Sequence, residues 1–454
     1  MEASRLFQQF IYWAVWLIIP IVWEILIGFI SAITVFFKFH FKKVKEDISF
    51  YPKVSILVPV YNSQKTLEAC LDSIFRQDYP KENIEILLID NGVKDKSYDI
   101  FVEFQAKHPQ SKIWWHTSGQ GKSKALNKGI FSSEGKYIIN IDSDGCLDGQ
   151  AIKNIVRRFE SNGEIICVSG VVLIDPELIK NTRGRSLRLV QLCELFEYTE
   201  SFLVGRNFQS IFNTIYTIAG AFSCFKREAL LKTQMYNSET LGEDAHMTFQ
   251  IKELVSGRLD MCEDAFFYVD PIESLDKIYL QRQRWQRAEL EVASLFTKQH
   301  IGGVVDFITK PAVRILVSDH TLVFPRLIWF FAVFYLYFIN YPLSLLIGAN
   351  VLLYIAYVTN SAIYLFVSGL YLKKQEKVRK YLYKNWYICF LLPIYRFIIY
   401  WVRVAGIVNS LKTESKWRTR SFSEEVGMVK KSVFDQIRLR FPVFDAIKRF
   451  INNE

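Results

Sequence analysis

KYIINIDSDG, residues 136–145, joins a short apolar run to two carboxylates that stand one residue apart. The run Tyr137–Ile141 has the length, and the turn residues at its ends, that are typical of a strand buried on both faces. Asp142 and Asp144 follow it directly, and in open parallel α/β sheets ligands bind at this carboxyl end of a strand. Such carboxylates offer oxygen ligands to Mg²⁺ or Mn²⁺ and leave positions for water and a diphosphate.

The Asp-x-Asp pair alone is a weak signal, because aspartate is common in turns, where it bonds to its own backbone. The sequence around the pair strengthens it. Lys53–Tyr61 and Glu85–Asp90 are further buried, β-rich runs, and a segment with helical spacing separates them. Strands and helices that alternate at short spacing predict an α/β domain with a mostly parallel sheet and helices on both faces.

The same patterns predict further elements along the chain. Further strands are expected at Lys112–His116, Ile165–Ile174, Ile218–Phe225 and Phe266–Val269. Helices are expected at Asn62–Arg76, Asp148–Glu160, Leu187–Leu203 and Leu275–Phe296, with others opening near Gly119–Gly129, at Arg227 and at Leu241.

Half of the 454 residues are hydrophobic, and the apolar excess is concentrated in three stretches, Phe10–Phe37, Thr321–Leu372 and Tyr387–Ser410. About 20 apolar residues cross the hydrocarbon core of a bilayer, so each stretch is long enough to do so. A cleaved signal peptide is not expected, because the first stretch is too long and lacks a small-residue cleavage site.

The net charge of +10 is gathered beside these stretches. The lysines and arginines concerned are Lys38, Lys42, Lys43, Lys45, Lys373, Lys374, Lys377, Arg379 and Lys380. This distribution indicates a positive-inside membrane topology and argues against nucleic-acid binding. The seven cysteines show neither paired nor zinc-binding spacing, so reduced thiols are expected.

The membrane segments leave alternatives open. Thr321–Leu372 fits a hairpin of two spans joined near Asn340–Pro342 or near Gly348–Asn350. A full span at Tyr387–Ser410 would place the basic tail outside, so that segment is re-entrant or interfacial, or another crossing exists, or the charge rule fails here. Phe434–Ile451 has the spacing of a helix on the membrane surface.

Glu24 is an unusual residue for a membrane segment, and it is expected either in a protein-lined path or near an interface.

We therefore expect four regions. They are an N-terminal transmembrane helix with a basic juxtamembrane segment (1–47), a cytosolic catalytic domain (48–300), interfacial and transmembrane helices (301–412), and a basic cytosolic or membrane-surface tail (413–454).

Several polar residues are expected to meet at the sheet edge beside Asp142 and Asp144. Asp90 ends its own strand, and Lys122 could bring a cation to a diphosphate. Glu243 and Asp244 begin a helix, where acids are also common because they complement the helix dipole. Each of these residues alone has a purely structural explanation, so the interpretation depends on their combination.

The segments VSILVPVYN, IDNG, GKSKALNKG, DSD, GED and QRQRW occur in this order. In that order they resemble the family 2 processive glycosyltransferases, the membrane synthases of cellulose, chitin, hyaluronan and poly-N-acetylglucosamine type. The resemblance covers about residues 52–290. LPIYRF and KWRTR resemble the closing region of the poly-N-acetylglucosamine synthase branch, and transferases encoded alongside exosortase-like systems in Gram-positive bacteria are similar too.

The resemblance implies a GT-A fold and a role for each matching residue. Asp90 would bind the uracil–ribose end of a UDP-sugar, Asp142 the nucleotide, and Asp144 the Mg²⁺ or Mn²⁺ ion on the diphosphate. Lys122 would assist at the nucleotide or phosphates. Asp244, beside Glu243, would be the general base. Gln281, Arg284 and Trp285 match Gln-x-x-Arg-Trp, in which the Trp stacks under the acceptor sugar and the Arg meets the diphosphate.

The sequence departs from the family pattern at two places. Gly242 stands where the family has Thr before Glu-Asp, and Asn91-Gly92-Val93 replaces the commoner Asp-Gly-Ser. Both departures keep the acid itself. Gly220 and Cys224 lie in AGAFSCF, where the family has a small-residue segment near the acceptor, although strand packing explains that segment equally well.

The expected activity is inverting transfer from a UDP-sugar to a growing β-linked polysaccharide, processive and coupled to export. UDP-N-acetylglucosamine is the first donor expected and UDP-glucose the second. The expected location is a bacterial cell membrane with a cytosolic catalytic domain, with room for an accessory membrane or export subunit. The alternatives are a transferase that adds one sugar to a lipid-linked or short acceptor, and a catalytically dead scaffold, against which the intact acids argue.

Overall fold

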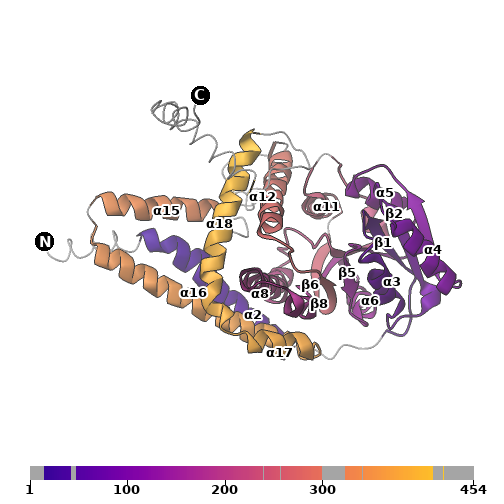
Figure 1. Cartoon of the computed structure of the whole chain (residues 1–454), viewed down its shortest axis with the longest axis horizontal. Coiled ribbons are helices and arrows are strands. Elements are labelled where there is room, and N and C mark those ends of the chain that lie inside the picture. The colour runs from indigo at the N-terminus through magenta and orange to yellow at the C-terminus, as the bar shows by residue number, and fades with distance from the viewer. Residues whose placement is uncertain are drawn as a thin grey trace, which may run out of the picture.

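The computed structural model describes residues 15–41, 48–238, 240–255, 257–298, 323–339, 341–412 and 423. An α/β domain forms one side of the molecule, and a group of long apolar helices projects from the other side (Figure 1). The expected surface helix at Phe434–Ile451 lies outside the described residues.

The core of the α/β domain is an eight-stranded sheet in the order β3-β2-β1-β4-β7-β6-β8-β5. The strands are β1 (Val54–Val60), β2 (Ile84–Asp90), β3 (Lys112–Thr117), β4 (Tyr137–Ile141), β5 (Gly145–Leu147), β6 (Ile165–Ile174), β7 (Phe222–Lys226) and β8 (Arg258–Val269). Strands β1 to β4 are parallel neighbours, β6 pairs in parallel with β8, and β7 runs antiparallel between β4 and β6. The mostly parallel α/β sheet is thus confirmed.

The predicted central strand is β4, and its five residues are all buried. β1 and β2 are equally apolar and form parallel ladders in register, with Val54 opposite Ile84 and Val60 opposite Asp90. Their buried faces explain why these segments read as continuous apolar runs rather than alternating ones. β8 is longer than its predicted core at Phe266–Val269, and β5 is a short strand that the sequence pattern did not predict.

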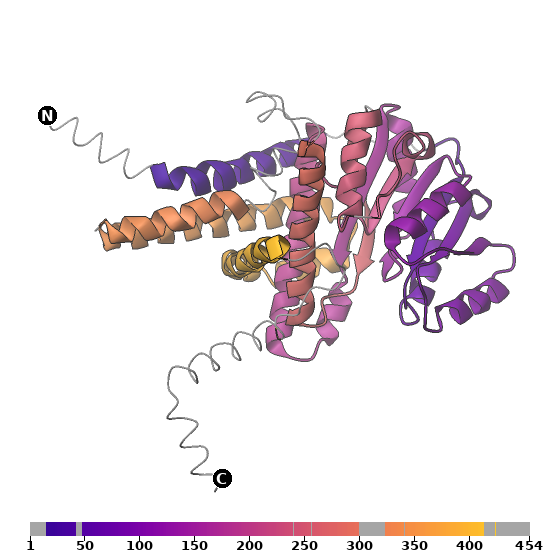
Figure 2. The ribbon, with the colours of Figure 1, turned by 90° about the horizontal axis from the view of Figure 1, so that it is seen from above.

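Helices cover the sheet and connect its strands. Those of the α/β domain are α3 (Leu67–Phe75), α4 (Ser97–Lys107), α5 (Lys122–Ser132), α6 (Ala151–Ser161), α7 (Pro176–Asn181), α8 (Arg185–Glu200), η4 (Ser201–Arg206), α9 (Asn207–Ile211), α10 (Arg227–Leu230), α11 (Glu243–Gln250), η5 (Ile251–Val255) and α12 (Leu275–Lys298). α5 begins directly after β3, so its first turn lies at the carboxyl edge of the parallel strands. α12 stands between the sheet and the apolar helices (Figure 2).

The apolar helices are η2 (Ile19–Leu26) continuing into α2 (Ile27–His40), α15 (Val323–Phe338), α16 (Leu343–Tyr371) and α18 (Ile388–Lys412), with α17 (Glu376–Lys384) before the last. Pro20–His40, Leu343–Tyr371 and Ile388–Asn409 are long and apolar enough to cross a membrane. The hairpin α15–α16 turns between Phe338 and Leu343, which is the first of the two predicted junctions.

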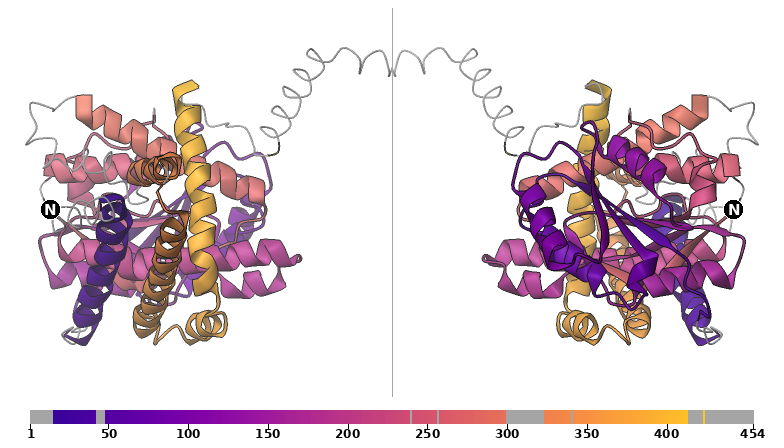
Figure 3. Two further views of the ribbon diagram at one scale, coloured as in Figure 1. Left: turned by 90° about the vertical axis from the view of Figure 1, so that its left-hand side faces the viewer. Right: turned by 90° about the vertical axis from the view of Figure 1, so that its right-hand side faces the viewer.

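α18 has a different direction from the other apolar helices. α2, α15 and α16 extend away from the sheet, whereas α18 runs across them, and all three figures agree on this (Figures 1, 2 and 3). α18 packs along α12 and also contacts α8 and α16. It therefore connects the α/β domain to α16, which also contacts α8 directly.

Candidate active site

One cavity of about 2080 Å³ runs from the carboxyl edge of the sheet to the apolar helices. Eight of the predicted site residues line it, namely Lys122, Asp142, Asp144, Glu243, Asp244, Gln281, Arg284 and Trp285. Its wall continues with Glu24, Arg326, Tyr357 and Arg396, which belong to or flank the apolar helices. Residues separated by more than 300 positions in the chain thus share one continuous space.

Asp142 and Lys122 form the ion pair at the sheet edge. The Nζ atom of Lys122 lies 2.5 Å from Oδ1 of Asp142 and 3.9 Å from Oε1 of Glu243. Burial alone would lower the pKa of Lys122, but the charges of Asp142 and Glu243 outweigh it and raise the pKa. Lys122 is therefore a fixed cation at the end of β4, suited to an oxyanion.

Asp144 lies beside this pair without a cation of its own within salt-bridge distance among the described residues. Burial, with the charge of Asp142 added to it, raises the pKa of Asp144 to about 6. A divalent cation would relieve that repulsion, and carboxylate oxygens suit Mg²⁺ or Mn²⁺. No three His, Cys, Asp or Glu side chains form a ligand set within the described residues, so a bound diphosphate would have to supply further ligands.

Asp90 has a different position from the other predicted residues. It ends β2 as expected, but its Oδ1 accepts hydrogen bonds from the backbone N–H groups of Gly92 and Val93, both at 2.8 Å. Asp90 is not among the residues that line the cavity, whereas Asn91 and Asp95 are. Its contact with a nucleotide stays a prediction, and its turn gives it a structural role as well.

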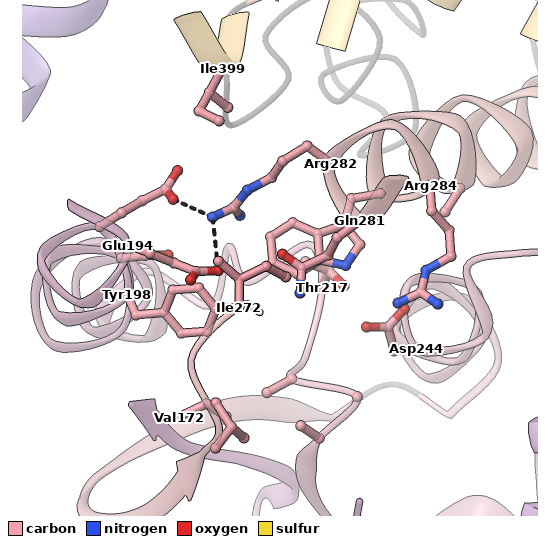
Figure 4. Close-up of a pocket in the computed structure, with 18 of the residues that line it drawn as sticks. Val172, Glu194, Tyr198, Thr217, Asp244, Ile272, Gln281, Arg282, Arg284 and Ile399 are labelled. Carbon is pink, nitrogen blue, oxygen red and sulfur yellow. Dashed lines mark hydrogen bonds and ion pairs between the residues drawn. The ribbon is translucent and has the colours of Figure 1, made fainter. Parts of the chain in front are cut away.

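Glu243 and Asp244 form the first turn of α11, facing the Lys122–Asp142 pair. Burial raises the pKa of Glu243, while Lys122 opposes that effect and Asp244 adds to it. Arg284 extends from α12 toward Asp244 (Figure 4). The acid predicted to act as a base and the arginine of the Gln-x-x-Arg-Trp motif therefore face the same part of the cavity.

Gly242, the departure before Glu243, has a steric explanation. A Cβ atom at Gly242 would lie 2.9 Å from the Cβ of Ala288 in α12. Contacts below about 3.0 Å force a shift, so α11 approaches α12 more closely here than a threonine would allow.

Gly220 lies directly against the predicted base. A Cβ atom there would lie 3.1 Å from Oδ2 of Asp244, which is tighter than an ordinary contact. Cys224, by contrast, is fully buried in β7 opposite Ile139 and does not line the cavity. Only Gly220 of the two small residues approaches the site.

Gly220→Ala is expected to lower the turnover of the enzyme several-fold without unfolding it, because the added methyl group pushes the Asp244 carboxylate aside. Displacements of about 1 Å in a reacting group can cost about 10²-fold. Steady-state assays of UDP release would measure the effect. Gly149→Ala is the matched control, since a Cβ atom there meets nothing within 4 Å. Equal activity of the two variants would contradict the placement of Asp244 beside Gly220.

Trp285 is held between two other side chains. The guanidinium of Arg282 lies 4.4 Å from its ring centroid, and the Tyr198 ring lies 6.4 Å away on α8. Gln281, one turn earlier, has a buried side-chain oxygen with no hydrogen-bond partner among the described residues. A fixed indole ring beside unpaired polar atoms is the kind of surface on which a sugar ring can stack.

Arg282 is a site residue that the sequence analysis missed. It is 1% exposed, and its Nη2 atom lies 2.5 Å from Oε2 of Glu197 and 3.7 Å from Oε1 of Glu194 (Figure 4). The same guanidinium lies 3.5 Å from the hydroxyl of Tyr395 in α18. The available signal was that Arg282 lies inside QRQRW, but it occupies one of the two variable positions of the Gln-x-x-Arg-Trp motif.

Glu194→Gln is expected to reduce the pH dependence of stability. Burial raises the pKa of Glu194 from 4.5 to about 7, with Arg282 opposing and Glu197 adding to the shift. The folded state therefore binds this proton more tightly than the unfolded chain, and the contribution to stability is lost as the pH rises through about 7.

Thermal unfolding in detergent, measured between about pH 5 and about pH 8, would test this, because the stability gained on acidification should be smaller in Glu194→Gln. Glu177→Gln, at an exposed position of α7, is the control. Identical slopes for Glu194→Gln and the native chain would refute the assignment.

Glu24 lies in a protein-lined position rather than at a free surface. Its two carboxylate oxygens accept hydrogen bonds from Nε and Nη2 of Arg326 at 2.8 and 2.7 Å. The hydroxyl of Tyr357 donates to it at 2.8 Å. These contacts connect η2 to α15 and α16 at the far end of the cavity. Of the two expected positions for Glu24, the structure therefore favours the protein-lined path.

Comparisons with known proteins include a family model and curated relatives. Residues 55–233 match the family model described as Glycosyl transferase family 2. A poly-β-1,6-N-acetyl-D-glucosamine synthase of Staphylococcus epidermidis is 26% identical over 249 residues, which are 55% of this chain and 57% of that protein. The probable glycosyltransferase YdaM of Bacillus subtilis is 23% identical over 406 residues, which are 88% of this chain and 91% of that protein.

Among solved structures, a mannosyltransferase from Pyrobaculum calidifontis in complex with GDP-Man and Mn²⁺ is similar, with a TM-score of 0.53. It is 16% identical, and the match covers 78% of this chain and 98% of that one. At this identity the likeness supports the fold alone. The chain spans little more than half the length of the Staphylococcus relative that it matches.

Proposed function

From the premise that residues 55–233 are a glycosyl transferase family 2 domain in a GT-A fold, we propose that this chain transfers sugar from a UDP-sugar to a growing β-linked polysaccharide. The transfer is inverting, and the product is extended processively and exported through the membrane. The observation that carries the proposal is the single cavity that joins the acidic sheet edge, Asp244 and Trp285 to the apolar helices.

The donor occupies the sheet edge. The Lys122 ammonium and the backbone turn at Gly121 offer positive charge to the diphosphate. Asp142 contacts the nucleotide, and Asp90, next to Asn91 in the cavity wall, serves the uracil–ribose end. UDP-N-acetylglucosamine is the first choice of donor because relatives of the chain are poly-N-acetylglucosamine synthases, and UDP-glucose is the second.

Asp144, with Asp142 nearby, would hold a Mg²⁺ or Mn²⁺ ion, and the donor set fits because both are carboxylates at the edge of a polar cavity. When bound, such an ion neutralises charge on a diphosphate leaving group. The Mn²⁺ in the complex of the Pyrobaculum mannosyltransferase is consistent with a divalent ion in this fold.

Asp244 acts as the general base. An acceptor hydroxyl is a poor nucleophile, and a carboxylate within reach takes its proton as the oxygen attacks the anomeric carbon. Attack from the face opposite UDP inverts the configuration, so an α-linked donor gives a β-linkage. Glu243 and Gly220 fix the position of Asp244, and Arg284 on the facing helix stabilises negative charge that grows on the diphosphate.

The acceptor sugar stacks on Trp285, which Arg282 and Tyr198 hold in place, with Gln281 available to bond a sugar hydroxyl. Beyond it the cavity continues to Arg396, Tyr357 and Glu24, so each added sugar moves the chain toward the membrane. This continuity favours a processive synthase over a transferase that adds one sugar.

The helix directions suggest a topology. If α2, α15 and α16 cross the bilayer, α18 lies across them as an interfacial helix, despite being long enough to span. The basic segment after α18 then stays on the cytosolic side, as the positive-inside rule requires. The catalytic domain faces the cytosol of a bacterial cell, and an accessory export subunit would meet the outer end of the helices.

UDP release by the purified, detergent-solubilised chain tests the proposal. A panel of UDP-sugars would be assayed with Mg²⁺, with Mn²⁺ and with EDTA, and the product sized on a gel. Metal-dependent release with one sugar and a long polymer is the expected result. Short or lipid-linked product would support single addition, and no release with any donor would overturn the proposed function.

Trp285→Ala is expected to shorten the product and weaken acceptor use, while UDP affinity changes little, because the ring contacts the acceptor side only. Stacking on an aromatic ring is worth about 1 kcal/mol or more, hence a several-fold effect. Product sizing and a UDP titration would separate the two roles. An equal loss of UDP affinity would contradict stacking on the acceptor.

A further inference from the structure

The helical run formed by α8, η4 and α9 presents a row of side chains to the cavity. Tyr198, Phe202 and Arg206 stand four residues apart, so they share one face. The Tyr198 and Phe202 rings lie 6.1 Å apart, and the Arg206 guanidinium lies 4.3 Å from the Phe202 ring. The row starts beside Trp285 and includes a π-helical turn, a feature that frequently marks functional sites.

Arg206 differs in its partners from Arg282 and Arg396, which also line the cavity. Arg282 has carboxylate partners at 2.5 and 3.7 Å, and Arg396 bonds to Glu200. Arg206 forms no ion pair within the described part of the chain, and its Nη1 atom has no hydrogen-bond partner there. Burial lowers the pKa of Arg206, and the opposing effects of Tyr216 and Asp244 do not outweigh it.

Gln209 lies one helical turn after Arg206 and lines the same cavity. Its side-chain oxygen is also buried without a hydrogen-bond partner among the described residues. The two residues thus combine an unused cationic donor with an unused carbonyl acceptor. A secondary amide matches both atoms, because it offers a carbonyl oxygen to the arginine and an N–H to the glutamine oxygen.

The pair is close to the reaction centre. Tyr216 and Asp244 both oppose the effect of burial on the pKa of Arg206, and both residues line the cavity with it. Trp285 lies at the other end of the aromatic row. An acceptor chain of several sugars that begins on Trp285 would therefore follow the row toward Arg206.

We infer that Arg206 and Gln209 bind the acetamido group of an N-acetylated sugar of the acceptor chain. Both residues border the cavity, and their two unpaired atoms are buried in its wall, so binding requires the side chains to turn toward the sugar. The inference rests on the proposed function and deepens it, because it makes the acceptor a polymer of N-acetylated amino sugars rather than of plain hexoses. A site built to bond a polar group discriminates strongly against analogues that lack it.

Binding of soluble oligosaccharides to the full-length, detergent-solubilised chain in the presence of UDP tests this. The probes are a tetramer of β-linked N-acetylglucosamine, its fully de-N-acetylated counterpart and a tetramer of β-linked glucose, with Kd measured by titration. The native chain is expected to prefer the N-acetylated probe. Arg206→Met and Gln209→Leu should each weaken that probe about tenfold and leave the others unchanged, because a charge-assisted hydrogen bond is lost.

Two further variants serve as controls. Arg206→Lys keeps the charge and one donor and should retain part of the preference, and Arg185→Met, at the exposed start of α8, should behave as the native chain. Absence of a preference in the native chain, a preference for the glucose probe, or equal weakening of all three probes would overturn the inference. UDP-sugar turnover is measured separately, so a failure of the proposed activity is distinguishable from a failure of this subsite.

Discussion

Asp244→Asn is expected to abolish sugar transfer while the affinity for UDP stays nearly unchanged. The amide keeps the size of the side chain and its acceptor oxygen, but it cannot take the proton from the acceptor hydroxyl. Loss of a general base typically lowers the rate by about 10²–10⁴-fold. UDP release under saturating donor, together with a separate UDP titration, would measure the two effects on one preparation.

The surroundings of Asp244 sharpen this test. Its carboxylate lies against Gly220 and in the first turn of α11, so the Asn side chain has little room to adopt another position. Glu253→Gln, an exposed acid on the same helical run, is the matched control and should retain native activity. Near-normal transfer by Asp244→Asn would show that another group acts as the base.

Arg282→Met is expected to destabilise the protein by about 3–5 kcal/mol, because the change leaves the buried Glu194 and the half-buried Glu197 without their cation. The methionine fills much of the same volume, so the effect isolates charge from packing. Thermal unfolding in detergent would measure it. Lys277→Met on the same helix removes only an exposed ion pair with Glu273, and we expect it to cost about 0–1 kcal/mol.

A compensating variant separates the effect of charge from the effect of side-chain shape in the cluster of Arg282, Glu194 and Glu197. Replacing Glu194 and Glu197 by Gln in the Arg282→Met background removes the uncompensated carboxylates and should restore much of the stability. Transfer should nonetheless stay impaired, since Trp285 loses the cation that lies 4.4 Å from its ring. Unchanged stability in Arg282→Met would contradict the structural importance of the cluster.

Arg282 also connects the proposed acceptor site at Trp285 to the apolar helix α18. Its guanidinium contacts Glu197 on α8 and the Tyr395 hydroxyl on α18, which packs along α12. Three elements that are distant in sequence therefore meet at one buried cation. A movement of α18 would therefore change the surroundings of Trp285. The Arg282 contacts give a physical route by which α18 and the proposed acceptor site influence one another.

Much of the fold could be predicted from sequence because its signals are local. The apolar run at Tyr137–Ile141, bounded by turn residues, specifies a buried strand through its own composition. The order of the motifs then placed Asp142, Asp144, Asp244 and Trp285, and all four line one cavity. The carboxyl ends of parallel strands meet at one edge, so such residues converge whenever the strand order is right.

Other features depend on packing between distant segments. No local pattern distinguishes Arg282 from a solvated arginine, because its partners lie 85 and 113 positions away. The same holds for Glu24, whose partner Arg326 is 302 positions away. Asp90 matched its motif, yet its Oδ1 is used by the turn at Gly92 and Val93 rather than turned to the cavity.

The sequence by itself determined most of the strands, the order of the acids and the presence of apolar helices, since each follows from residue type and period along a short stretch. The GT-A class was implied by the resemblance of the ordered motifs to a known family. Only the tertiary structure decided the direction of α18, the continuity of the cavity and, among the described residues, the lack of hydrogen-bond partners for Arg206 Nη1 and Gln209 Oε1. Length and hydropathy report whether a helix can cross a bilayer, but its direction is set by the elements that it packs against. Whether a buried polar atom has a hydrogen-bond partner likewise depends on how all the neighbouring elements pack around it.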